Sequence, residues 1–377
     1  MAFQLTEEQV MMRNMAREFA QKEIAPRDKW MDENGFDEET HKKFVETGLA
    51  GLHIPEAYGG ADADPVTVAL VMQELARASG SFATAQTVNV LTSKVLAHAT
   101  EEQKQKYLGE MAAGKRFAFS LTESTGGSDA GGALMSTCIK QEDGTWLLNG
   151  SKAWITNIGI ADYYVVLAKT DPAAGTRGIS AFIMPKDVQG LTVGRPEDKM
   201  GMRGSNTGEL SFDNIALPED ALIGEVGRGF AMAMQALDGG RVNAAAICTG
   251  IAKHAYEIGK DYAKTRMAFG KPISKFQGIS FKFADMSMKL NAMELLTLNA
   301  ASMMARGERC TVEAAQAKLY ASTEGLNVCL DAQQTLGGNG YSKEYHVERL
   351  VRDIRMFQFG EGTTEILKVV IGGSVFA

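Results

Sequence analysis

A single carboxylate near the end of the chain, Glu361, stands where acid–base chemistry is possible. It lies between two glycines in RMFQFGEGTTEILK (residues 355–368), just before Thr363 and Thr364, which are suitable N-cap residues for a following helix. Glycines let the backbone bend sharply and approach another molecule closely. The stretch is therefore typical either of a carboxylate presented to a ligand or of a solvated glutamate in a loop before a capped helix.

A second stretch, FSLTESTGGSDAGG (Phe119–Gly132), has the composition of a strand that runs into a polar, glycine-rich loop. Successive backbone N–H groups in such a loop, together with the hydroxyls of Thr122 and Ser128, can hold anionic or carbonyl oxygens. The stretch lacks G-x-G-x-x-G and no βαβ pattern surrounds it, so it is not a Rossmann dinucleotide site. A flexible turn that binds nothing is the alternative interpretation.

A third stretch, KAWITN (Lys152–Asn157), combines an aromatic ring and a hydroxyl on an expected strand. Because side chains alternate along a strand, Trp154 and Thr156 lie on the same face. That pairing suits a flat ring with a polar edge, although a tryptophan that simply packs in the core fits the pattern as well.

Three later segments carry weaker signals. RMAFGKPISKFQ (Arg266–Gln277) joins two expected helices and offers an arginine, an aromatic ring and a glutamine, which together can clamp a phosphate and a heteroaromatic ring. QQTLGGNGY (Gln333–Tyr341) is a glycine-dense turn that permits close approach of a ligand. LDGGR (Leu237–Arg241) keeps two glycines inside an expected helix, a local conflict that hints at function. Ordinary connecting loops remain the alternative for the first two segments.

Composition narrows the class of protein. The 377 residues are enough for two or three domains, and a net charge of −7 without a basic cluster argues against nucleic-acid binding. No apolar run is long enough to insert into a membrane, and the first residues lack the basic and apolar segments of a signal peptide, so a cytoplasmic protein is expected. The scattered cysteines and five dispersed histidines predict no metal site, so the chemistry is expected to need a bound cofactor. The cysteines are Cys138, Cys248, Cys310 and Cys329.

The elements that must position these residues fall into three expected domains. Residues 1–117 read as helical, and TEEQ occurs at Thr6–Gln9 and at Thr100–Gln103 as a capping box at two helix starts. Residues 118–228 carry short β-branched and aromatic runs that predict an antiparallel β domain. Residues 229–377 return to long helical patterns typical of a bundle.

Within the β domain, Asn149-Gly150 separates two apolar runs in GTWLLNGSKAWIT, and it predicts a two-residue hairpin turn at that point. The order of the domains along the chain is α, β, α. The sequence therefore predicts an α+β protein with an N-terminal helical domain, a middle antiparallel β domain and a C-terminal four-helix bundle.

The order of the motifs resembles the acyl-CoA dehydrogenase family of flavoproteins, and its short- or branched-chain type most of all. The resemblance runs from about Leu5 to the end of the chain, and it implies the same three-domain fold with FAD as the cofactor. The segments that carry it are LTESTGGSD, WITN, RGSNTGELSFDNIALP, GRGF, RMAFGKPISKFQ, QTLGGNGY and GEGTTEI.

The resemblance also implies roles for individual residues. Residues of the middle domain would contact the flavin and the diphosphate: Phe119, Leu121, Thr122, Ser128, Trp154, Ile155 and Thr156. A second set would grip the diphosphate and adenosine of FAD bound to a neighbouring subunit: Arg266, Phe269, Gln277, Gln334, Leu336, Gly337 and Gly338. Thr363 and Glu365 would add FAD contacts near the end of the chain. Acyl-CoA would be bound by Ser128, Asp238, Arg241 and Gly362.

The activity implied is α,β-dehydrogenation of an acyl-CoA thioester to the trans-2-enoyl-CoA, with electrons passed to an electron-transfer flavoprotein. The resemblance also implies that the protein is a homotetramer. Glu361 would remove the α-proton while flavin N5 takes the β-hydride. A glutamate has a reference pKa of about 4.3, so burial beside an apolar ligand would have to raise it. Some family members carry the base at the position of Gly240, and the glycine here leaves Glu361 without a rival.

Two other functional classes stay open. An acyl-CoA oxidase or a flavin monooxygenase built on the same fold would share the FAD segments but would let oxygen reach the reduced flavin. A helical scaffold without catalytic activity would bind no FAD. The resemblance favours a short or branched acyl group and does not define the acyl chain further.

Overall fold

The two capping boxes of the N-terminal part form as the sequence predicts. In this computed structural model, which describes residues 4–376, the Thr6 hydroxyl accepts a hydrogen bond from the Gln9 backbone N–H, and the Gln9 side chain accepts one from the Thr6 backbone N–H. Thr100 and Gln103 repeat the arrangement. The first and last residues of the expected N-terminal and C-terminal domains, 1–3 and 377, lie outside the described residues. The helices of this part are α1 (Glu7–Phe19), α2 (Asp28–Asn34), α3 (Glu38–Glu46), α4 (Pro65–Ala78), α5 (Gly80–Leu96) and α6 (Glu101–Ala112).

An eight-stranded sheet follows, in the order β6-β7-β3-β2-β4-β5-β8, with β1 paired to β4. Most pairs are antiparallel as expected, but β1 runs parallel to β4, and a single bridge from β2 to β4 is also parallel. The strands are β1 (Phe117–Ser120), β2 (Thr137–Lys140), β3 (Trp146–Thr156), β4 (Tyr163–Lys169), β5 (Ile179–Pro185), β6 (Leu191–Val193), β7 (Thr207–Leu217) and β8 (Leu222–Ile223).

The hairpin expected at Asn149-Gly150 is wrong. Strand β3 continues through both residues, and the turn between β2 and β3 instead uses Asp143-Gly144, where the Asp143 carboxylate accepts the Thr145 backbone N–H. Gly150 lies at a bulge against β7, with φ +132°, and a Cβ there would lie 2.4 Å from Ser136 Oγ. The glycine is thus explained by an irregular strand and a close neighbour, which produce the same local signal as a turn.

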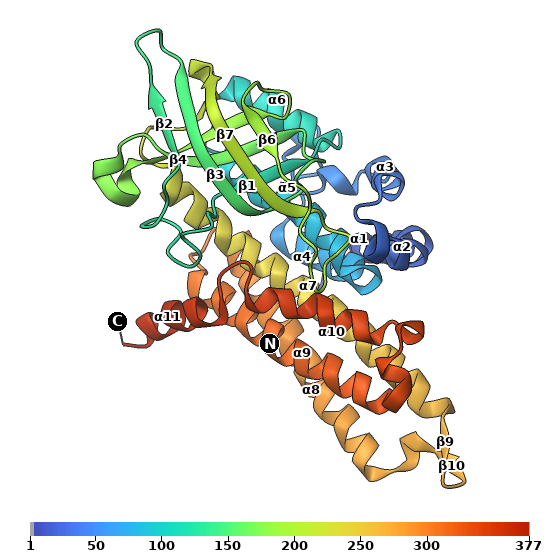
Figure 1. Cartoon of the computed structure of the whole chain (residues 1–377). Helices are drawn as coiled ribbons and strands as arrows, with labels where there is room; N and C mark the ends of the chain where they lie inside the picture. The colour runs from blue at the N-terminus through green and yellow to red at the C-terminus, as the bar shows by residue number, and fades with distance from the viewer. Residues whose placement is uncertain (1–3, 377) are drawn as a thin grey trace.

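The C-terminal part is a helical bundle, and the three-domain α, β, α architecture predicted from the sequence is confirmed (Figure 1). Its longest helix, α7, extends over 37 residues. A small hairpin of β9 (Met267–Ala268) and β10 (Lys271–Pro272) lies at the end of the bundle farthest from the sheet. The helices are α7 (Gly229–Thr265), α8 (Gln277–Ala305), α9 (Thr311–Leu336), α10 (Val347–Arg355) and α11 (Thr364–Val375).

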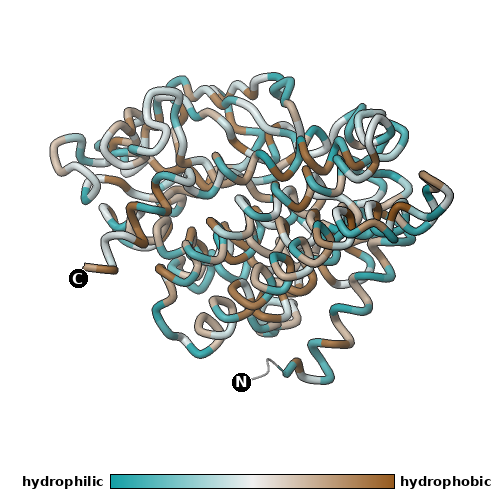
Figure 2. Tube along the Cα trace, turned by 90° about the horizontal axis from the view of Figure 1, so that it is seen from below, coloured by the Kyte–Doolittle hydropathy of each residue, from teal (hydrophilic) through white to brown (hydrophobic). Residues whose placement is uncertain are grey.

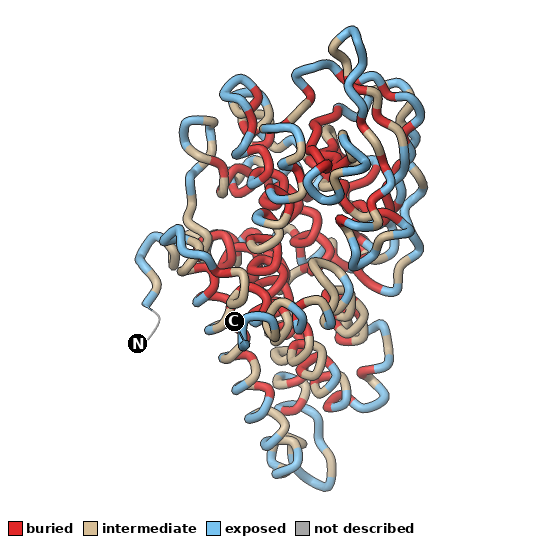
Figure 3. Tube along the Cα trace, turned by 90° about the vertical axis from the view of Figure 1, so that its left-hand side faces the viewer, coloured by how far each residue is buried: buried red, intermediate tan, exposed pale blue. Residues whose placement is uncertain are grey.

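Helix α7 forms the centre of the molecule because it packs on helices of both helical domains. Its segment 242–252 is buried throughout, and it lies in one hydrophobic core with residues of α4 and α9. Hydrophobic and hydrophilic residues alternate along the bundle helices (Figure 2). Buried segments concentrate where the two helical domains meet, while the far end of the bundle is more exposed (Figure 3). Over residues 4–376, no helix is long and apolar enough to span a membrane.

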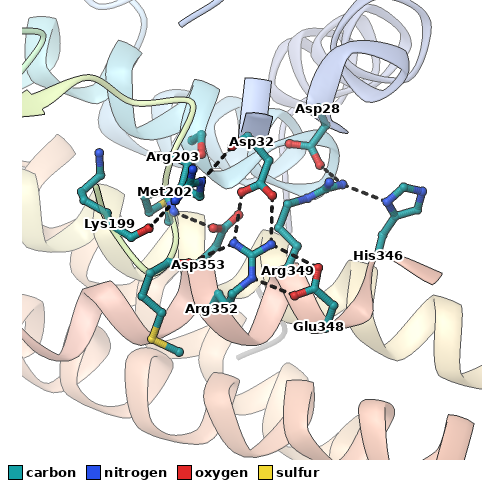
Figure 4. Close-up of polar contacts among 12 residues, drawn as sticks. Asp28, Asp32, Lys199, Met202, Arg203, His346, Glu348, Arg349, Arg352 and Asp353 are labelled. Carbon is teal, nitrogen blue, oxygen red and sulfur yellow. Dashed lines mark hydrogen bonds and ion pairs between the residues drawn. The ribbon is translucent and has the colours of Figure 1, made fainter. Parts of the chain in front are cut away.

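A cluster of ion pairs joins the three domains at one point (Figure 4). Arg352 on α10 binds Asp32 on α2 at 3.0 Å and Glu348 at 2.7 Å, and Arg349 pairs with Asp28. Asp353, next to them, accepts the backbone N–H of Met202 at 2.6 Å and thereby ties the segment between β6 and β7 to α10. Helix α10 is therefore held to the N-terminal domain by ion pairs and to the sheet domain by a hydrogen bond.

The buried carboxyl of Asp353 predicts a pH-dependent stability. Burial raises its pKa from 3.8 to about 7, helped by the nearby negative charges of Asp28 and Asp32. Between about pH 4 and pH 7 the folded chain therefore holds a proton that the unfolded chain releases, so this group lowers stability as pH rises. Asp353→Asn keeps an acceptor for Met202 and removes the ionisation.

We expect Asp353→Asn to melt close to wild type at pH 5 and to exceed it by about 3 °C or more at pH 8. Thermal unfolding followed by circular dichroism across this pH range measures the difference. Asp187→Asn, at an exposed carboxylate of the sheet domain, is the control. A constant difference between Asp353→Asn and wild type at all pH values would contradict the assignment.

Candidate active site

Glu361 lies in a sharp turn between α10 and α11. Its φ is 57° and that of Gly362 is 90°, so two consecutive residues adopt the left-handed conformation. A non-glycine residue adopts this conformation rarely and at an energetic cost, which the surrounding contacts must offset. Thr363 then caps α11, because its hydroxyl accepts the Ile366 backbone N–H at 3.2 Å. The glutamate is therefore presented by a strained turn just before a capped helix.

The carboxylate of Glu361 points at a gap in the side chains of α7. Its Oε2 atom is buried and has no hydrogen-bond partner among residues 4–376, although the residue as a whole keeps some exposed surface. A Cβ built on Gly240 would lie 2.5 Å from this oxygen and 3.4 Å from Leu91 Cδ1 on α5. The carboxylate can approach α7 only because residue 240 has no side chain.

Burial raises the pKa of Glu361 above its ordinary value of 4.5, while the positive charges of Lys318 and Arg241 oppose that rise. A desolvated carboxylate without a hydrogen bond to Oε2 is a stronger base than a solvated one. The site is therefore suited to removing a proton from a weak carbon acid that is bound against α7.

Lys318 on α9 is the residue that sequence reasoning missed here. Its side chain is fully buried, and its Nζ donates a hydrogen bond to the Gly362 carbonyl oxygen at 2.5 Å. Burial lowers its pKa to about 8. The signal was present in AAQAKLYAS, where one lysine lies on a face otherwise made of Ala314, Ala317 and Ala321, all fully buried.

Asp238 and Arg241, predicted to contact acyl-CoA, lie one helical turn apart on α7, on either side of Gly240. Arg241 is 7% exposed, and its guanidinium donates to Asp238 Oδ1 at 2.8 Å. The second oxygen, Oδ2, accepts the Thr311 hydroxyl at 2.7 Å. The structure thus brings Asp238, Arg241 and Gly362 to the vicinity of Glu361.

The predicted residues of the middle domain gather at the ends of β1 and β3. Ala153 donates its backbone N–H to the Thr122 carbonyl at 2.9 Å, which brings the loop after β1 beside β3. Trp154 occupies a bulge with φ 60° and is 63% exposed, while Thr156 is partly exposed on the same strand. Ile155 is buried, so its side chain packs in the core. Of the others, Leu121 is buried, Phe119 and Thr122 are partly exposed and Ser128 is exposed.

A buried ion pair that the sequence analysis did not identify organises the loop after β1. Lys152, 1% exposed, contacts Glu123 Oε1 at 2.7 Å and the Leu121 carbonyl at 3.2 Å. Glu123 in turn accepts the backbone N–H groups of Met135 and Ser136, where the loop returns to the sheet. This pairing fixes both ends of the loop that contains Ser128.

The remaining predicted residues lie at the far end of the bundle, around β9 and β10 (Figure 1). Asn339 Nδ2 donates to the Tyr262 hydroxyl at 2.9 Å, which joins the glycine-rich turn after α9 to the end of α7. Phe269 is 94% exposed and Leu336 only 3%, so Leu336 has just its backbone to offer a ligand. Exposed residues make up the rest of this group: Arg266, Gln277, Gln334, Gly337 and Gly338.

The predicted site residues therefore lie in three places within one chain. One set lies around Glu361 and includes Thr363 and the exposed Glu365 on α11, and a second set lies at the ends of β1 and β3. The third set lies at the opposite end of the bundle. Among the described residues no cluster of His, Cys, Asp and Glu side chains is arranged to hold a metal ion, and the four cysteines are buried and unbonded to one another.

Comparison with known proteins identifies the family. The three acyl-CoA dehydrogenase domain models match the chain in order: the N-terminal domain at residues 6–115, the middle domain at 118–215 and the C-terminal domain at 227–376. An acyl-CoA dehydrogenase of Bacillus subtilis is 47% identical over 97% of each chain.

Two further similarities extend over the whole length. Caffeyl-CoA reductase-Etf complex subunit CarC of Acetobacterium woodii is 41% identical over 98% of each chain. The structure of butyryl-CoA dehydrogenase from Megasphaera elsdenii has a TM-score of 0.96, with 40% identity and full coverage of both chains. The chain belongs to the acyl-CoA dehydrogenase family and is an oxidoreductase of that class.

Proposed function

We propose that this enzyme dehydrogenates an acyl-CoA thioester between its α- and β-carbons, with Glu361 as the base that removes the α-proton. The observation that carries the proposal is the Glu361 carboxylate itself: it is buried against Gly240, it lacks a partner for Oε2 among residues 4–376, and a left-handed turn holds it in place. A structural carboxylate would have its oxygens satisfied by hydrogen bonds or ion pairs. A carboxylate that must accept a proton from a ligand needs one oxygen free.

The same turn supplies a donor for the substrate. The backbone N–H of Glu361 has no acceptor among residues 4–376, whereas those of Phe359 and Gly360 both donate to the Met356 carbonyl. An α-proton becomes acidic enough to remove only when the negative charge developing on the thioester oxygen is stabilised by hydrogen-bond donors. We assign the Glu361 N–H to that oxygen, so that one residue contributes both the base and a donor.

The cofactor is FAD, and the residues present fit it. Trp154 is a large exposed ring beside Thr156 and the hydroxyl-rich loop after β1, an arrangement that suits a flat heteroaromatic ligand with a polar edge. The proposed ring contacts are Phe119, Leu121, Thr122, Trp154, Ile155 and Thr156, with Ser128 at the diphosphate and with Thr363 and Glu365 nearby. Bound FAD supplies the acceptor for the hydride that leaves the β-carbon.

The acyl-CoA contacts proposed are Ser128, Asp238, Arg241 and Gly362, and the substrate class is a short or branched acyl thioester. Arg241 is buried and already paired with Asp238, so it offers a fixed cationic group beside the thioester end of the ligand. We further propose an electron-transfer flavoprotein as the acceptor, because the similar A. woodii protein is named as a subunit of a reductase-Etf complex and therefore assembles with a flavoprotein of this kind. A reduced enzyme that reoxidises slowly in air favours this acceptor over an oxidase reaction.

A homotetramer is proposed because two surfaces need a partner. Helix α8 exposes Phe281, Met288 and Leu295 at 63%, 65% and 56%, spaced seven residues apart along one face. A stripe of this kind is typical of a helix that packs on another subunit. The distal group that includes Arg266 and Gln277 lies next to the start of this stripe, and it would complete the FAD site of a neighbouring subunit.

The first test of function is Glu361→Gln, which keeps the volume and the backbone N–H but cannot accept the α-proton. We expect FAD content, fold and acyl-CoA binding to be retained, while anaerobic bleaching of the flavin by substrate falls at least about 100-fold. Stopped-flow absorbance with a panel of short and branched acyl-CoA thioesters measures the effect. Glu344→Gln, exposed in the same domain, is the control, and bleaching of Glu361→Gln at the wild-type rate would refute the proposed base.

Gly240→Ala tests the approach of the carboxylate to α7. The added Cβ would meet Glu361 Oε2 at 2.5 Å, so the carboxylate must shift, and we expect flavin reduction to slow by about 10- to 100-fold. Gly239→Ala is a matched control, because its Cβ would lie 3.8 Å from Met304 Sδ, an ordinary contact. Both changes should raise helix stability slightly, so a rate loss in both variants would count against the specific clash.

The subunit arrangement is tested by Phe281→Glu with Met288→Glu, which introduces two charges on the apolar stripe. We expect a smaller species in analytical ultracentrifugation and a loss of bound FAD, because a shared site cannot form without its neighbour. Asn299→Glu, an exposed residue of the same helix, is the control. Dissociation with full FAD retention would show that the cofactor is held within one subunit.

A further inference from the structure

Lys318 is a buried cation whose surroundings do not explain it as an ordinary structural lysine. Its side chain is 0% exposed, and no carboxylate among residues 4–376 lies within ion-pair distance of it. Its ammonium group uses one donor, toward the Gly362 carbonyl oxygen. Burying an ammonium with a single neutral acceptor lowers stability, so a hydrophobic residue of similar volume would suit the fold better.

The position of Lys318 relates it to the turn that holds Glu361. Four residues further along α9, the Ser322 carbonyl oxygen accepts a hydrogen bond from Gln358 Nε2 at 3.2 Å. Lys318 and Ser322 are one helical turn apart, so they lie on the same face of α9. Helix α9 therefore holds the backbone of the turn at Gly362 and its entry at Gln358, on the two sides of Glu361.

The charged groups around Glu361 come from two helices. Helix α9 contributes Lys318, and α7 contributes Arg241, whose charge is already shared with Asp238. Helix α5 contributes the uncharged Leu91. Lys318 also lies near the Cys248 thiol of α7, whose own pKa is strongly raised by burial, so this thiol stays neutral. Of the two positive charges near the Glu361 carboxylate, Arg241 is paired with Asp238, whereas Lys318 is paired with no described carboxylate.

We propose that Lys318 is a positioning residue for Glu361: its ammonium fixes the left-handed turn through Gly362 and supplies the buried positive charge that keeps the carboxylate ionised before it takes the α-proton. This inference rests on the proposed role of Glu361. An ionised carboxylate beside an apolar ligand needs a compensating positive charge. The Lys318 ammonium, hydrogen-bonded to the Gly362 carbonyl, provides this charge and leaves Glu361 Oε2 free.

The sign of the effect follows from the charges. Burial raises the pKa of Glu361 and the charge of Lys318 opposes that rise, so removing the lysine leaves a higher pKa. The base is then protonated at a pH where the wild-type base is free, and the rising limb of the rate–pH profile moves to higher pH.

Two variants separate the charge from the hydrogen bond. Lys318→Gln keeps a hydrogen-bond donor but carries no charge, while Lys318→Met removes both the donor and the charge and retains the volume. Lys289→Met is the control, because Lys289 of α8 pairs with Glu324 of α9 at 2.8 Å, away from the turn. The full-length enzyme with FAD bound is used throughout, and the visible spectrum reports its FAD content.

The measurement is anaerobic flavin reduction by an acyl-CoA substrate between pH 5 and pH 9. We expect both Lys318 variants to shift the rising limb of the rate–pH profile to higher pH by about one unit. At pH values on the acid side of the limb, the rate should then be about tenfold lower than in wild type. Lys318→Met should in addition reach a lower plateau, because the turn is no longer held. Lys289→Met should match the wild type. An unshifted limb in both Lys318 variants overturns the proposal, and Lys318→Gln decides alone if Lys318→Met does not fold.

A second readout does not depend on activity. Lys318→Met removes an uncompensated cation when Glu361 is already glutamine, but it also removes a favourable longer-range attraction to the Glu361 carboxylate when Glu361 is present. We therefore expect Lys318→Met to raise the melting temperature more in the Glu361→Gln background than in wild type, by at least about 1 °C at pH 7, where Lys318 is still mostly charged. If Lys318→Met changes the melting temperature equally in both backgrounds, Lys318 and Glu361 are not coupled and the proposal is overturned.

The two levels of proposal fail separately. If Glu361→Gln reduces flavin at the wild-type rate, Glu361 is not the base, and the proposed function fails whatever Lys318 does. If Glu361→Gln is inactive while both Lys318 variants keep the wild-type pH profile, the function stands and only the role of Lys318 is refuted.

Discussion

The close approach of the Glu361 carboxylate to α7 is the constraint on which the rest of the site depends. It requires a residue without a side chain at Gly240 and a turn that passes through the left-handed conformation at Glu361 and Gly362. It also keeps Oε2 free of partners among residues 4–376, at the cost of leaving a polar atom unsatisfied in the interior. Helix α9 compensates by binding the backbone of the turn at Gly362, so the strain at Glu361 is offset by contacts outside it.

Buried charges recur wherever a flexible segment must be held in one position. Lys152 and Glu123 fix the loop after β1, Arg349 and Asp28 join α10 to α2, and Lys318 binds the turn that contains Glu361. Removing one partner of the Lys152–Glu123 or Arg349–Asp28 pair would leave an uncompensated buried charge, so each pair favours the one conformation in which both partners meet. The buried apolar residues around α7 supply hydrophobic stabilisation without direction, and the buried charges favour particular loop conformations.

The proposed FAD contacts lie in two separate groups, which is a physical reason to propose that subunits associate. The exposed ring of Trp154 lies at the sheet, whereas Arg266 and Gln277 lie at the opposite end of the bundle. We propose that the two groups contact FAD from different subunits, and the exposed apolar residues of α8 beside the second group are suited to packing on a neighbour. In the proposed homotetramer, α8 would therefore link assembly to cofactor binding.

The sequence by itself determined the three-domain α, β, α order, both capping boxes and the family, because local periodicity, caps and motif order are properties of short segments. It also singled out Glu361 through its flanking glycines. It misplaced the hairpin at Asn149-Gly150, since a bulge and a turn favour the same residues. Only the tertiary structure revealed Lys318 beside Gly362, the Lys152–Glu123 pair and the contact between Gly240 and Glu361. These residues lie between 29 and 121 positions apart in the sequence, and no local pattern records which buried side chains meet when distant helices pack.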